Sequence, residues 1–306
     1  MATVDVVIPT WRGRDLLAGC LEHLSGQTHP DMQVIVVDNA SGDGTAEMVR
    51  ERFPAVRVIE MPDNVGFGRA VNAGVRAGHG EFVVLLNNDV EVEPQFVAAI
   101  VAPLADDGVA MVAGLTLIPG SGLVDAFGIE VDPTLAAYNR LRGRDPGNRP
   151  GVLAGPSGGA AAYRRSAWDE AGGLDETLFA YGEDLDLALR MRAAGWRVAD
   201  APEARGVHLG GASVGVGSPW QRELGGFARG YLLRRYGVLR GRQAVRALIF
   251  EALVVGWGIV RHRTLVPLTA RVAGWRAGAG ERRSVPADAI DRSIGWRESF
   301  DRLRRP

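Results

Sequence analysis

The chain has 306 residues, of which 46% are hydrophobic, so its composition excludes a disordered protein and provides for a sizeable core. The net charge of −1 conceals an uneven distribution: residues 1–219 carry 17 arginines against 29 acids, whereas residues 220–306 carry 18 arginines against 7 acids. A single cysteine, Cys20, excludes a disulfide framework and a cysteine metal site and favours a reducing location. We expect no nucleic-acid partner.

The termini and the longest apolar stretch bear on location. The first residues, MATVDVVIPTW, lack the basic start and long apolar stretch of a secretory signal. Residues 247–260 are apolar but contain Glu251, and the stretch is too short to predict a spanning helix. Because arginines flank it, it can either lie on an anionic membrane surface or pack as a buried helix. We therefore expect a cytoplasmic protein, with peripheral contact to the inner face of the membrane and a homodimer as open alternatives.

Strand-like and helix-like segments alternate through the first third of the chain. The pattern predicts strands at residues 4–10, 32–40, 56–61 and 80–90, with helices between them at residues 14–27, 44–53 and 66–78. The strands are almost wholly apolar, which is typical of a parallel sheet covered by helices on both faces. The sequence therefore predicts an α/β domain.

Polar or turn-forming residues follow three of these strands. They are Pro9-Thr10-Trp11, Asp38-Asn39 and Asn87-Asn88-Asp89. Asp and Asn are common in turns, so each group taken alone fits a structural role. However, ligands of parallel α/β sheets bind at the carboxyl ends of the strands. Three such groups at one edge predict a ligand pocket there.

The sequence changes in character after residue 114. Glycine and proline become more frequent, and strand-like segments at residues 123–132 and 158–165 indicate a mixed, partly antiparallel part. Residues 140–151, RLRGRDPGNRPG, are typical of a flexible loop. From about residue 216 the chain is predicted to be helical and rich in arginine.

Three carboxylates gather in the segment LFAYGEDLDLALRMRAAGW, residues 178–196. Glu183, Asp184 and Asp186 lie where a loop turns into a predicted helix. Acids near a helix start are stabilised by the backbone N–H groups, and this reading is favoured for Asp186. The alternative is that one carboxylate is a general base beside a substrate pocket.

Asp89 and His208 are candidate metal ligands. A carboxylate that emerges from a buried strand can bind a divalent cation, which usually also holds substrate phosphates. His208, in VHLGGAS, offers a nitrogen ligand and precedes glycines that allow a phosphate to approach. A lone histidine is more often structural. Its combination with Asp89 and the carboxylate cluster favours a site for Mg²⁺ or Mn²⁺.

The ordered motifs resemble those of glycosyltransferase family 2. They are VVIPTW, VVDNASGDGT, NVGFGRAVNAG, LLNNDV, GGLDETLFAYGEDLDLALRMRAAGW and VHLGGAS. Members of this family are inverting enzymes of the GT-A fold, and the chain looks most like rhamnosyltransferases and related enzymes that build bacterial surface polysaccharides. The resemblance covers about residues 4–215.

The resemblance implies a fold and a division of the chain. The expected fold is GT-A, a Rossmann-like, mostly parallel sheet flanked by helices, with a partly antiparallel acceptor half and a helical C-terminal extension. Residues 1–113 would bind the nucleotide sugar, residues 114–215 would hold the acceptor and the catalytic residues, and residues 216–306 would form the arginine-rich extension.

The resemblance also implies roles for the residues on the nucleotide side. Pro9 and Thr10 correspond to residues that line the nucleotide site. Asp38 corresponds to the acid that contacts the base, and Asn64 with the turn at Gly66 lies near the ribose or base.

The metal motif and the base can be placed in the same way. The acidic metal motif of the family falls on Asn87-Asn88-Asp89, where only Asp89 is acidic, and His208 is similar to a metal-contacting histidine. Asn88 and Asp89 would face the nucleotide sugar, and metal affinity without the nucleotide should be weak. Asp184 corresponds to the base, and Glu183 to a residue for positioning or acceptor binding.

The resulting prediction is an inverting, metal-dependent glycosyltransferase. It would move rhamnose or a similar sugar from a dTDP- or UDP-sugar to a hydroxyl of a glycan or lipid-linked glycan. A polyprenyl-phosphate glycosyltransferase and a non-catalytic nucleotide-binding protein are alternatives. A dinucleotide-dependent oxidoreductase is disfavoured because IPTWRGRD lacks the G-x-G-x-x-G turn. Sugar-stacking aromatic candidates are Trp11, Tyr181, Trp196 and Trp220.

Overall fold

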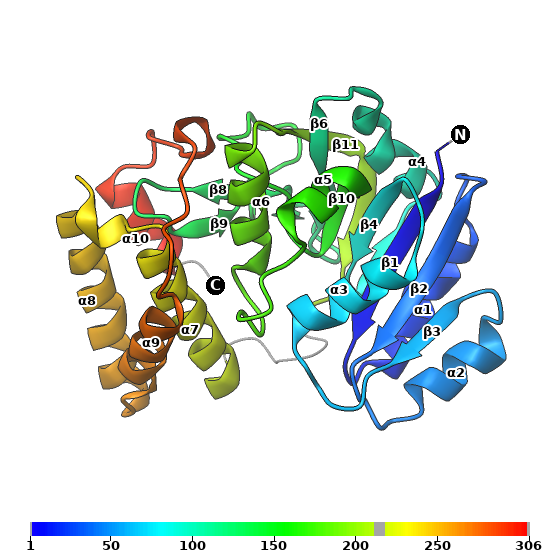
Figure 1. Cartoon of the computed structure of the whole chain (residues 1–306), viewed down its shortest axis with the longest axis horizontal. Helices are drawn as coiled ribbons and strands as arrows, with labels where there is room; N and C mark the ends of the chain where they lie inside the picture. Colours follow the sequence, from blue (N-terminus) through cyan, green and yellow to red (C-terminus); the bar gives the residue numbers. More distant parts are fainter. Residues whose placement is uncertain (1, 211–217, 305–306) are drawn as a thin grey trace.

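A twisted sheet forms the centre of the fold in the computed structural model, which describes residues 2–210 and 218–304. The predicted motif residues 211–213 and the predicted boundary at residue 215 lie outside the described residues. The nine-stranded sheet has the order β3-β2-β1-β4-β10-β6-β11-β5, with β7 paired to β6 (Figure 1). Its strands are β1 (Val4–Thr10), β2 (Met32–Asp38), β3 (Arg57–Glu60), β4 (Phe82–Leu86), β5 (Val90–Val92), β6 (Val109–Leu117), β7 (Val124–Ala126), β10 (Ala160–Arg164) and β11 (Arg197–His208).

The register of the sheet brings the carboxyl ends of the first strands together. Strand β1 runs parallel to β2 and β4, and Thr10 lies opposite Asp38. Strand β10 is inserted antiparallel between β4 and β6, so β6 and β11 run in the same direction as β1. The predicted mixture of parallel and antiparallel strands is therefore confirmed.

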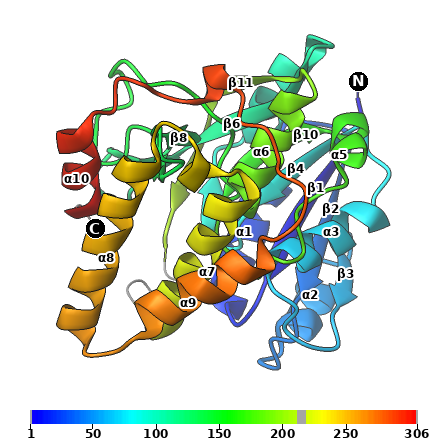
Figure 2. The ribbon, with the colours of Figure 1, turned by 60° about the vertical axis from the view of Figure 1, so that its left-hand side comes forward.

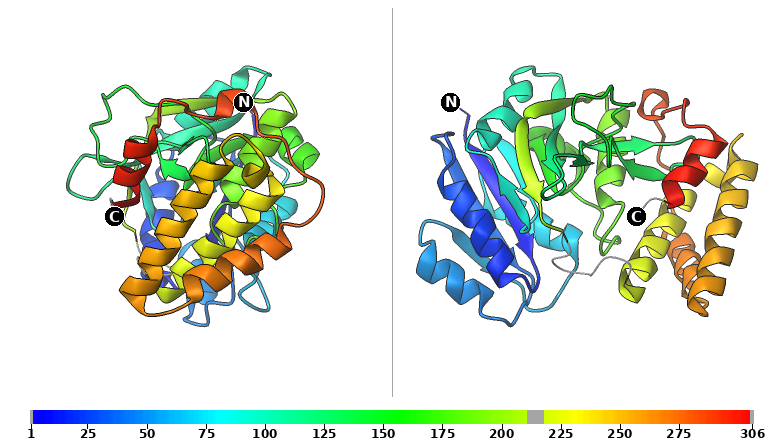
Figure 3. Two further views of the ribbon diagram at one scale, coloured as in Figure 1. Left: turned by 90° about the vertical axis from the view of Figure 1, so that its left-hand side faces the viewer. Right: turned by 180° about the vertical axis from the view of Figure 1, so that it is seen from behind.

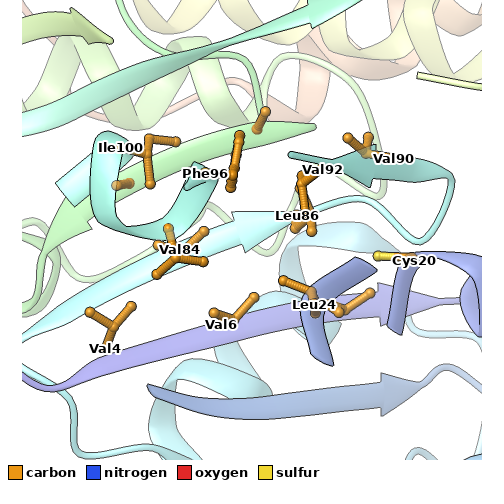
Figure 4. Packing of buried hydrophobic residues seen from close by; sticks show 14 of the residues in the cluster. Val4, Val6, Cys20, Leu24, Val84, Leu86, Val90, Val92, Phe96 and Ile100 are labelled. Atoms are coloured by element: carbon orange, nitrogen blue, oxygen red, sulfur yellow. The ribbon is translucent and has the colours of Figure 1, made fainter. Parts of the chain in front are cut away.

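Two layers of helices cover the sheet. On one face lie α1 (Arg14–Ser25), α2 (Thr45–Arg52) and α4 (Phe96–Val101), and on the other lie α3 (Phe67–Ala77), α5 (Arg165–Ala171) and α6 (Glu183–Ala193). Figure 4 shows the first core, where Val6 and Leu86 from the sheet meet Phe96 of α4 and Cys20 of α1. Burial raises the pKa of the Cys20 thiol, which lies in this apolar layer.

A helical extension packs against α6. It comprises α7 (Pro219–Arg235), α8 (Ala244–His262), α9 (Val266–Ala277) and α10 (Trp296–Arg304), beside a small sheet of β8 (Ile129–Val131) and β9 (Ala137–Asn139) (Figure 2). Glycines allow α7 and α9 to cross closely, because a Cβ at Gly274 would lie 1.8 Å from the carbonyl oxygen of Phe227. Leu185 and Leu189 of α6 join the apolar cluster of the extension. Helix α6 is therefore buried on two sides.

Two sequence predictions need correction. The fourth strand ends at Leu86 rather than near residue 90, because the chain turns and then forms β5, which pairs antiparallel with β11. The loop at residues 140–151 does not begin as a flexible segment. Arg140 is buried, donates to the carbonyl oxygen of Phe127 and pairs with Asp200 at 2.6 Å. The ion pair with Asp200 and the stacking of Arg140 over the Phe127 ring fix the start of this segment. The local sequence pattern does not reveal these contacts.

Candidate active site

The carboxyl ends of β1 and β2 form one wall of the candidate site. Thr10 and Asp38 are buried, with 3% and 5% of their surface exposed. The carbonyl oxygen of Thr10 accepts a hydrogen bond from the Asn39 backbone N–H, and Asp38 Oδ1 accepts the Ser41 N–H at 3.0 Å. Pro9 precedes Thr10 opposite Val37. The structure confirms that these strand-end residues lie together at one edge of the sheet. Their roles in binding stay predictions.

Asn39 belongs to the predicted rim, although the sequence assigned it no separate role. Its amide donates to Asn64 Oδ1 at 2.9 Å, and its own oxygen accepts the Val65 N–H at 2.9 Å. Asn64 also accepts the Gly66 N–H, so the two asparagines fix the turn before α3. A Cβ at Gly66 would lie 2.5 Å from the carbonyl oxygen of Phe179. Only glycine fits there, and the loop before α6 rests directly on this turn.

Asn88 is oriented by the first strand. Its side-chain amide donates to Thr10 Oγ1 at 2.8 Å, and a Cβ at Gly13 would lie 2.6 Å from Asn88 Nδ2. The loop after β4 and the start of α1 therefore approach closely. This contact turns the Asn88 side chain toward β1. The acidic residue of the loop is the next one, Asp89, which is also buried.

Asp89 and His208 lie together at the end of β11. His208 Nε2 is 3.2 Å from Asp89 Oδ1, and His208 Nδ1 is 2.7 Å from Asp125 Oδ2 on β7. Burial lowers the pKa of His208, but hydrogen bonds and charge from Asp125 and Asp89 outweigh burial and raise it to about 10. Arg142 in turn pairs with Asp125 at 2.5 Å. The sequence did not reveal Asp125, since it lies 83 positions from His208.

The donor set at this point fits a divalent cation. Asp89 Oδ1 is buried, and its neighbour among the described residues is His208 Nε2 at 3.2 Å, so a cation here would take the place of the His208 proton. His208 Nε2 lies beside it, while Asp125 holds the other ring nitrogen, which is the arrangement that orients a metal-binding imidazole. No group of three or more such ligands occurs in residues 2–210 and 218–304. Substrate oxygens would have to complete the coordination.

The predicted catalytic carboxylates lie at the first turn of α6. The turn before the helix is set by two left-handed residues, Tyr181 with φ of 72° and Gly182 with φ of 84°. Asp184 Oδ2 accepts the Gly158 N–H at 3.2 Å, and the neighbouring Gly159 accepts the Asn87 N–H at 3.0 Å through its carbonyl oxygen. A single glycine turn therefore connects the predicted base to the start of the predicted metal-binding loop.

The two acids differ in environment. Glu183 is buried, and its Oε2 has no hydrogen-bond partner among the described residues. Burial, followed by the charges of Asp184 and Asp186, raises the pKa of Glu183 to about 8. Burial also raises the pKa of Asp184, but the N–H groups of Gly158 and Leu185 oppose this change. These N–H groups favour the ionised form of Asp184, whereas no N–H group contacts Glu183 Oε2, so the pair is arranged to hold its negative charge on Asp184 and a proton on Glu183.

A cavity of about 340 Å³ lies against both carboxylates. Glu183, Asp184 and Tyr181 line it from the α6 side, and Ala228 and Arg229 of α7 line it from the opposite side. The strands β8 and β9 contribute the remaining wall. The extension therefore supplies part of the cavity next to the predicted base.

Asp186 does more than stabilise the start of a helix. It is fully buried, its carboxylate accepts the Tyr236 hydroxyl at 2.8 Å, and it pairs with Arg190 at 2.8 Å and with Arg283. Tyr236 and Arg283 belong to the extension. The interpretation of Asp186 as a helix-start acid is therefore incomplete, because its carboxylate ties α6 to the last part of the chain.

The aromatic candidates separate into three positions. Trp11 and Trp220 pack edge to face with centroids 5.3 Å apart, and Phe179 lies 5.7 Å from Trp220. Tyr181 lines the cavity. Trp196 lies before the first residue of β11, at the opposite edge of the sheet, and donates to Glu170. Trp196 is therefore not a sugar-stacking residue of this site.

Because Glu183 is buried, we expect the stability of the protein to depend on pH. The pKa of Glu183 is about 8 in the folded protein and 4.5 in an ordinary glutamate, so between these pH values the folded state keeps a proton that the unfolded chain loses. The free energy of unfolding of the wild type should therefore fall from pH 4.5 to about 8. Glu183→Gln should remove this fall, which is on the order of a few kcal/mol. Urea unfolding across this pH range measures it, and a pH-independent difference between the two proteins would contradict it.

Sequence comparisons identify related enzymes. The description of glycosyl transferase family 2 matches residues 5–172. An N-acetylglucosaminyl-diphospho-decaprenol L-rhamnosyltransferase of Mycobacterium tuberculosis is 30% identical over 242 residues, covering 69% of this chain and 78% of that protein. An N-acetylglucosaminyltransferase of Rhizobium meliloti is 28% identical over 224 residues, covering 67% of this chain and 50% of that protein.

Solved structures share the fold. The mannosyltransferase PcManGT of Pyrobaculum calidifontis, solved with GDP-Man and Mn²⁺, has a TM-score of 0.58 at 21% identity and covers 91% of this chain and 76% of that chain. GalNAc-T7, solved with UDP, GalNAc and Mn²⁺, has a TM-score of 0.58 at 17% identity and covers 87% and 58% of the two chains. Because the family description spans more than half of the sequence and the rhamnosyltransferase is matched over most of its length, the chain belongs to glycosyl transferase family 2 and is a glycosyltransferase of the GT-A fold.

Proposed function

We propose that the protein is an inverting, metal-dependent glycosyltransferase that moves rhamnose or a similar sugar from a nucleoside-diphospho sugar to a hydroxyl of a glycan or lipid-linked glycan. The observation that carries this proposal is the carboxylate pair Glu183 and Asp184, which faces a cavity of about 340 Å³ and is joined through one glycine turn to the loop of Asp89. Residues 1–113 would bind the donor, residues 114–215 would hold the acceptor, and residues 216–306 would complete the acceptor cavity.

Asp184 is the proposed general base. An acceptor hydroxyl must lose its proton as its oxygen attacks the anomeric carbon, and a positioned carboxylate contributes about 10²- to 10⁴-fold to such a step. The N–H groups of Gly158 and Leu185 contact the two carboxylate oxygens of Asp184 and favour its ionised form. Glu183, still protonated, would donate a hydrogen bond to the acceptor or hold the base in place. One displacement by one base inverts the anomeric centre.

The donor would occupy the rim at the carboxyl ends of the strands. Pro9, Thr10 and Asp38 would line the nucleoside pocket, and the turn of Asn64 and Gly66 would close it. A divalent cation held by Asp89 and His208, with Asn88 beside it, would offset the negative charge of the leaving diphosphate. Asp125 would keep His208 oriented.

The relatives support a sugar donor and a lipid-linked acceptor. The Mycobacterium tuberculosis relative is named for transfer of L-rhamnose to N-acetylglucosaminyl-diphospho-decaprenol, and two structural neighbours were solved with a nucleotide and Mn²⁺. We therefore propose dTDP-rhamnose or a UDP-sugar as donor. In the alternative proposal the acceptor is a polyprenyl phosphate. Its phosphate, rather than a sugar hydroxyl, would then lie beside Asp184 in the same cavity.

Thermal unfolding tests the donor site. We expect one of dTDP, UDP or GDP to raise the midpoint of unfolding with Mn²⁺ and to raise it less with a chelator, because a ligand that binds only the folded state stabilises it. Asp89→Asn should remove the metal-dependent part of the shift. Asp288→Asn, on the exposed partner of Arg192, is the matched control and should keep the whole shift.

Two outcomes would overturn this assignment. Stabilisation by NAD⁺ alone would contradict a nucleoside-diphospho sugar. An equal shift in wild type and Asp89→Asn at every metal concentration would contradict the metal role of Asp89. Product analysis with a glycan, a lipid-linked glycan and a polyprenyl phosphate then identifies the acceptor class.

A further inference from the structure

Helix α8 exposes a continuous apolar stripe. Most of its exposed apolar side chains recur at intervals of three or four residues, so they share one side of the helix, while Ala247 on the opposite side is buried. The exposed fractions run from 42% at Ile249 to 74% at Val260. The stripe consists of Val245, Leu248, Ile249, Leu253, Trp257 and Val260.

Helix α9, which follows α8, also exposes apolar side chains. Leu265, Leu268 and Val272 are 59%, 45% and 40% exposed, and they follow directly after the turn that ends α8. Figures 2 and 3 show α8 and α9 joined end to end at the outer surface of the extension. A patch of large apolar side chains on this scale marks an interaction surface rather than ordinary surface variation. We refer to these exposed residues of α8 and α9 as the apolar face.

The charge around the apolar face is positive. Residues 242–277 contain six arginines and one acid, Glu251. Glu251 pairs with Arg229 at 2.6 Å and with Arg271 at 2.7 Å, so its charge is already neutralised. The remaining exposed arginines form no ion pair within residues 2–210 and 218–304: they are Arg242, Arg261, Arg263 and Arg276.

The exposed apolar side chains and the flanking arginines together indicate which partner binds this face. An anionic bilayer offers an apolar interior beneath a layer of negative headgroups, which complements apolar side chains flanked by arginines. A second copy of the same face would instead bring arginine against arginine, and like charges oppose association. No helix among the described residues is long and apolar enough to cross a membrane. We propose that the apolar face binds the surface of an anionic lipid bilayer, with α8 and α9 lying on it.

The apolar face adjoins the proposed acceptor cavity. A second cavity of about 210 Å³ is lined by Phe250, Glu251 and Val254 from the inner side of α8, and it shares Tyr138 and Arg229 with the catalytic cavity. The turn between α8 and α9 points toward the same end of the molecule as the carboxyl ends of the strands (Figures 1 and 3). An acceptor anchored in the bilayer could therefore place its sugar near Asp184. This last link rests on the proposed function, whereas bilayer binding does not.

Vesicle co-sedimentation of the full chain tests the proposal. The wild type should sediment with vesicles of phosphatidylcholine and phosphatidylglycerol, and less with pure phosphatidylcholine. The double variant Trp257→Ser with Val260→Ser should reduce binding about tenfold, since two large apolar side chains leave the bilayer. Arg261→Gln with Arg263→Gln should reduce it about tenfold or more, and salt should reproduce that loss.

Matched controls separate this site from general charge. Arg50→Gln with Arg52→Gln removes two positive charges from α2, at the opposite end of the molecule, and should keep vesicle binding. Each variant should also keep the wild-type unfolding midpoint and its transfer to a water-soluble acceptor, so a loss of binding is not a loss of folding or catalysis.

Three results would overturn the proposal. They are absence of vesicle binding by the wild type, equal binding by the α8 variants, and a dimer in sedimentation velocity that Trp257→Ser with Val260→Ser dissociates. The last result would identify the apolar face as a contact between copies of the chain. Because binding is measured without turnover, failure here leaves the transferase proposal intact, and absence of transfer leaves the bilayer proposal intact.

Discussion

Asp184→Asn should lower kcat for sugar transfer by about 10²- to 10⁴-fold while the Kd for the nucleotide changes less than about twofold. The amide keeps the shape of the side chain and can still contact Gly158, but it cannot accept the acceptor proton. Radiolabelled transfer and calorimetric titration of the nucleotide measure the two quantities. Since burial raises the pKa of Asp184, wild-type kcat/KM should fall as the pH drops through that raised value, and this limb should be absent from the residual rate of the variant.

Glu183→Gln is the informative comparison for this variant. The glutamine can still donate a hydrogen bond, as a protonated Glu183 does, so kcat should fall much less than in Asp184→Asn. An equal loss in both variants would assign the base to the pair rather than to Asp184. A parallel loss of nucleotide affinity in Asp184→Asn would contradict its role as base.

Asp186→Ala should lower the free energy of unfolding by about 3–5 kcal/mol, because it leaves charged partners without their buried counter-ion. Asp186 is fully buried and is bound by Arg190, Arg283 and the Tyr236 hydroxyl. Urea unfolding measures the loss. The extension should also be cleaved sooner in limited proteolysis, and the KM for the acceptor should rise because α7 lines the proposed acceptor cavity.

Asp288→Ala is the control for a surface pair. Asp288 binds Arg192, but its side chain is 80% exposed, so this change should cost less than about 1 kcal/mol. A similarly small cost for Asp186→Ala would show that the extension is held by apolar packing alone. Unchanged acceptor KM in a destabilised Asp186→Ala protein would separate the stability role from the acceptor cavity.

The nucleotide half was predictable because its signals are local. Alternation of apolar strands with helices predicts the parallel sheet, and the parallel register then places Thr10, Asp38 and Asn88 at one edge. The pairing of Asp89 with His208 was also expected, although 119 positions separate them in the numbering, because the family motif supplies both. The structure establishes that the two side chains lie together. Their binding of a metal ion stays a prediction.

The extension was not predictable in the same way. The local sequence explains Asp186 as an acid at the start of a helix. Nothing in that segment indicates its partner Arg283, which lies 97 positions later. The same holds for Asp125 beside His208. For residues 247–260 the sequence left a buried and a surface helix open, and α8 has one face of each kind. Side-chain pairs across long separations depend on packing, which a periodic pattern does not specify.

The tie between Asp186 and Arg283 bears on how the enzyme becomes active during synthesis. Chains emerge from the ribosome amino end first, and their early parts can fold before the rest is made. The strands that end at Thr10 and Asp38, and the turn that carries Asp89, have been synthesised once the first third of the chain has emerged. The environment of Asp184 is complete only after Arg283 has emerged and joined α6. A nascent chain should therefore be able to hold a nucleotide well before it can transfer a sugar.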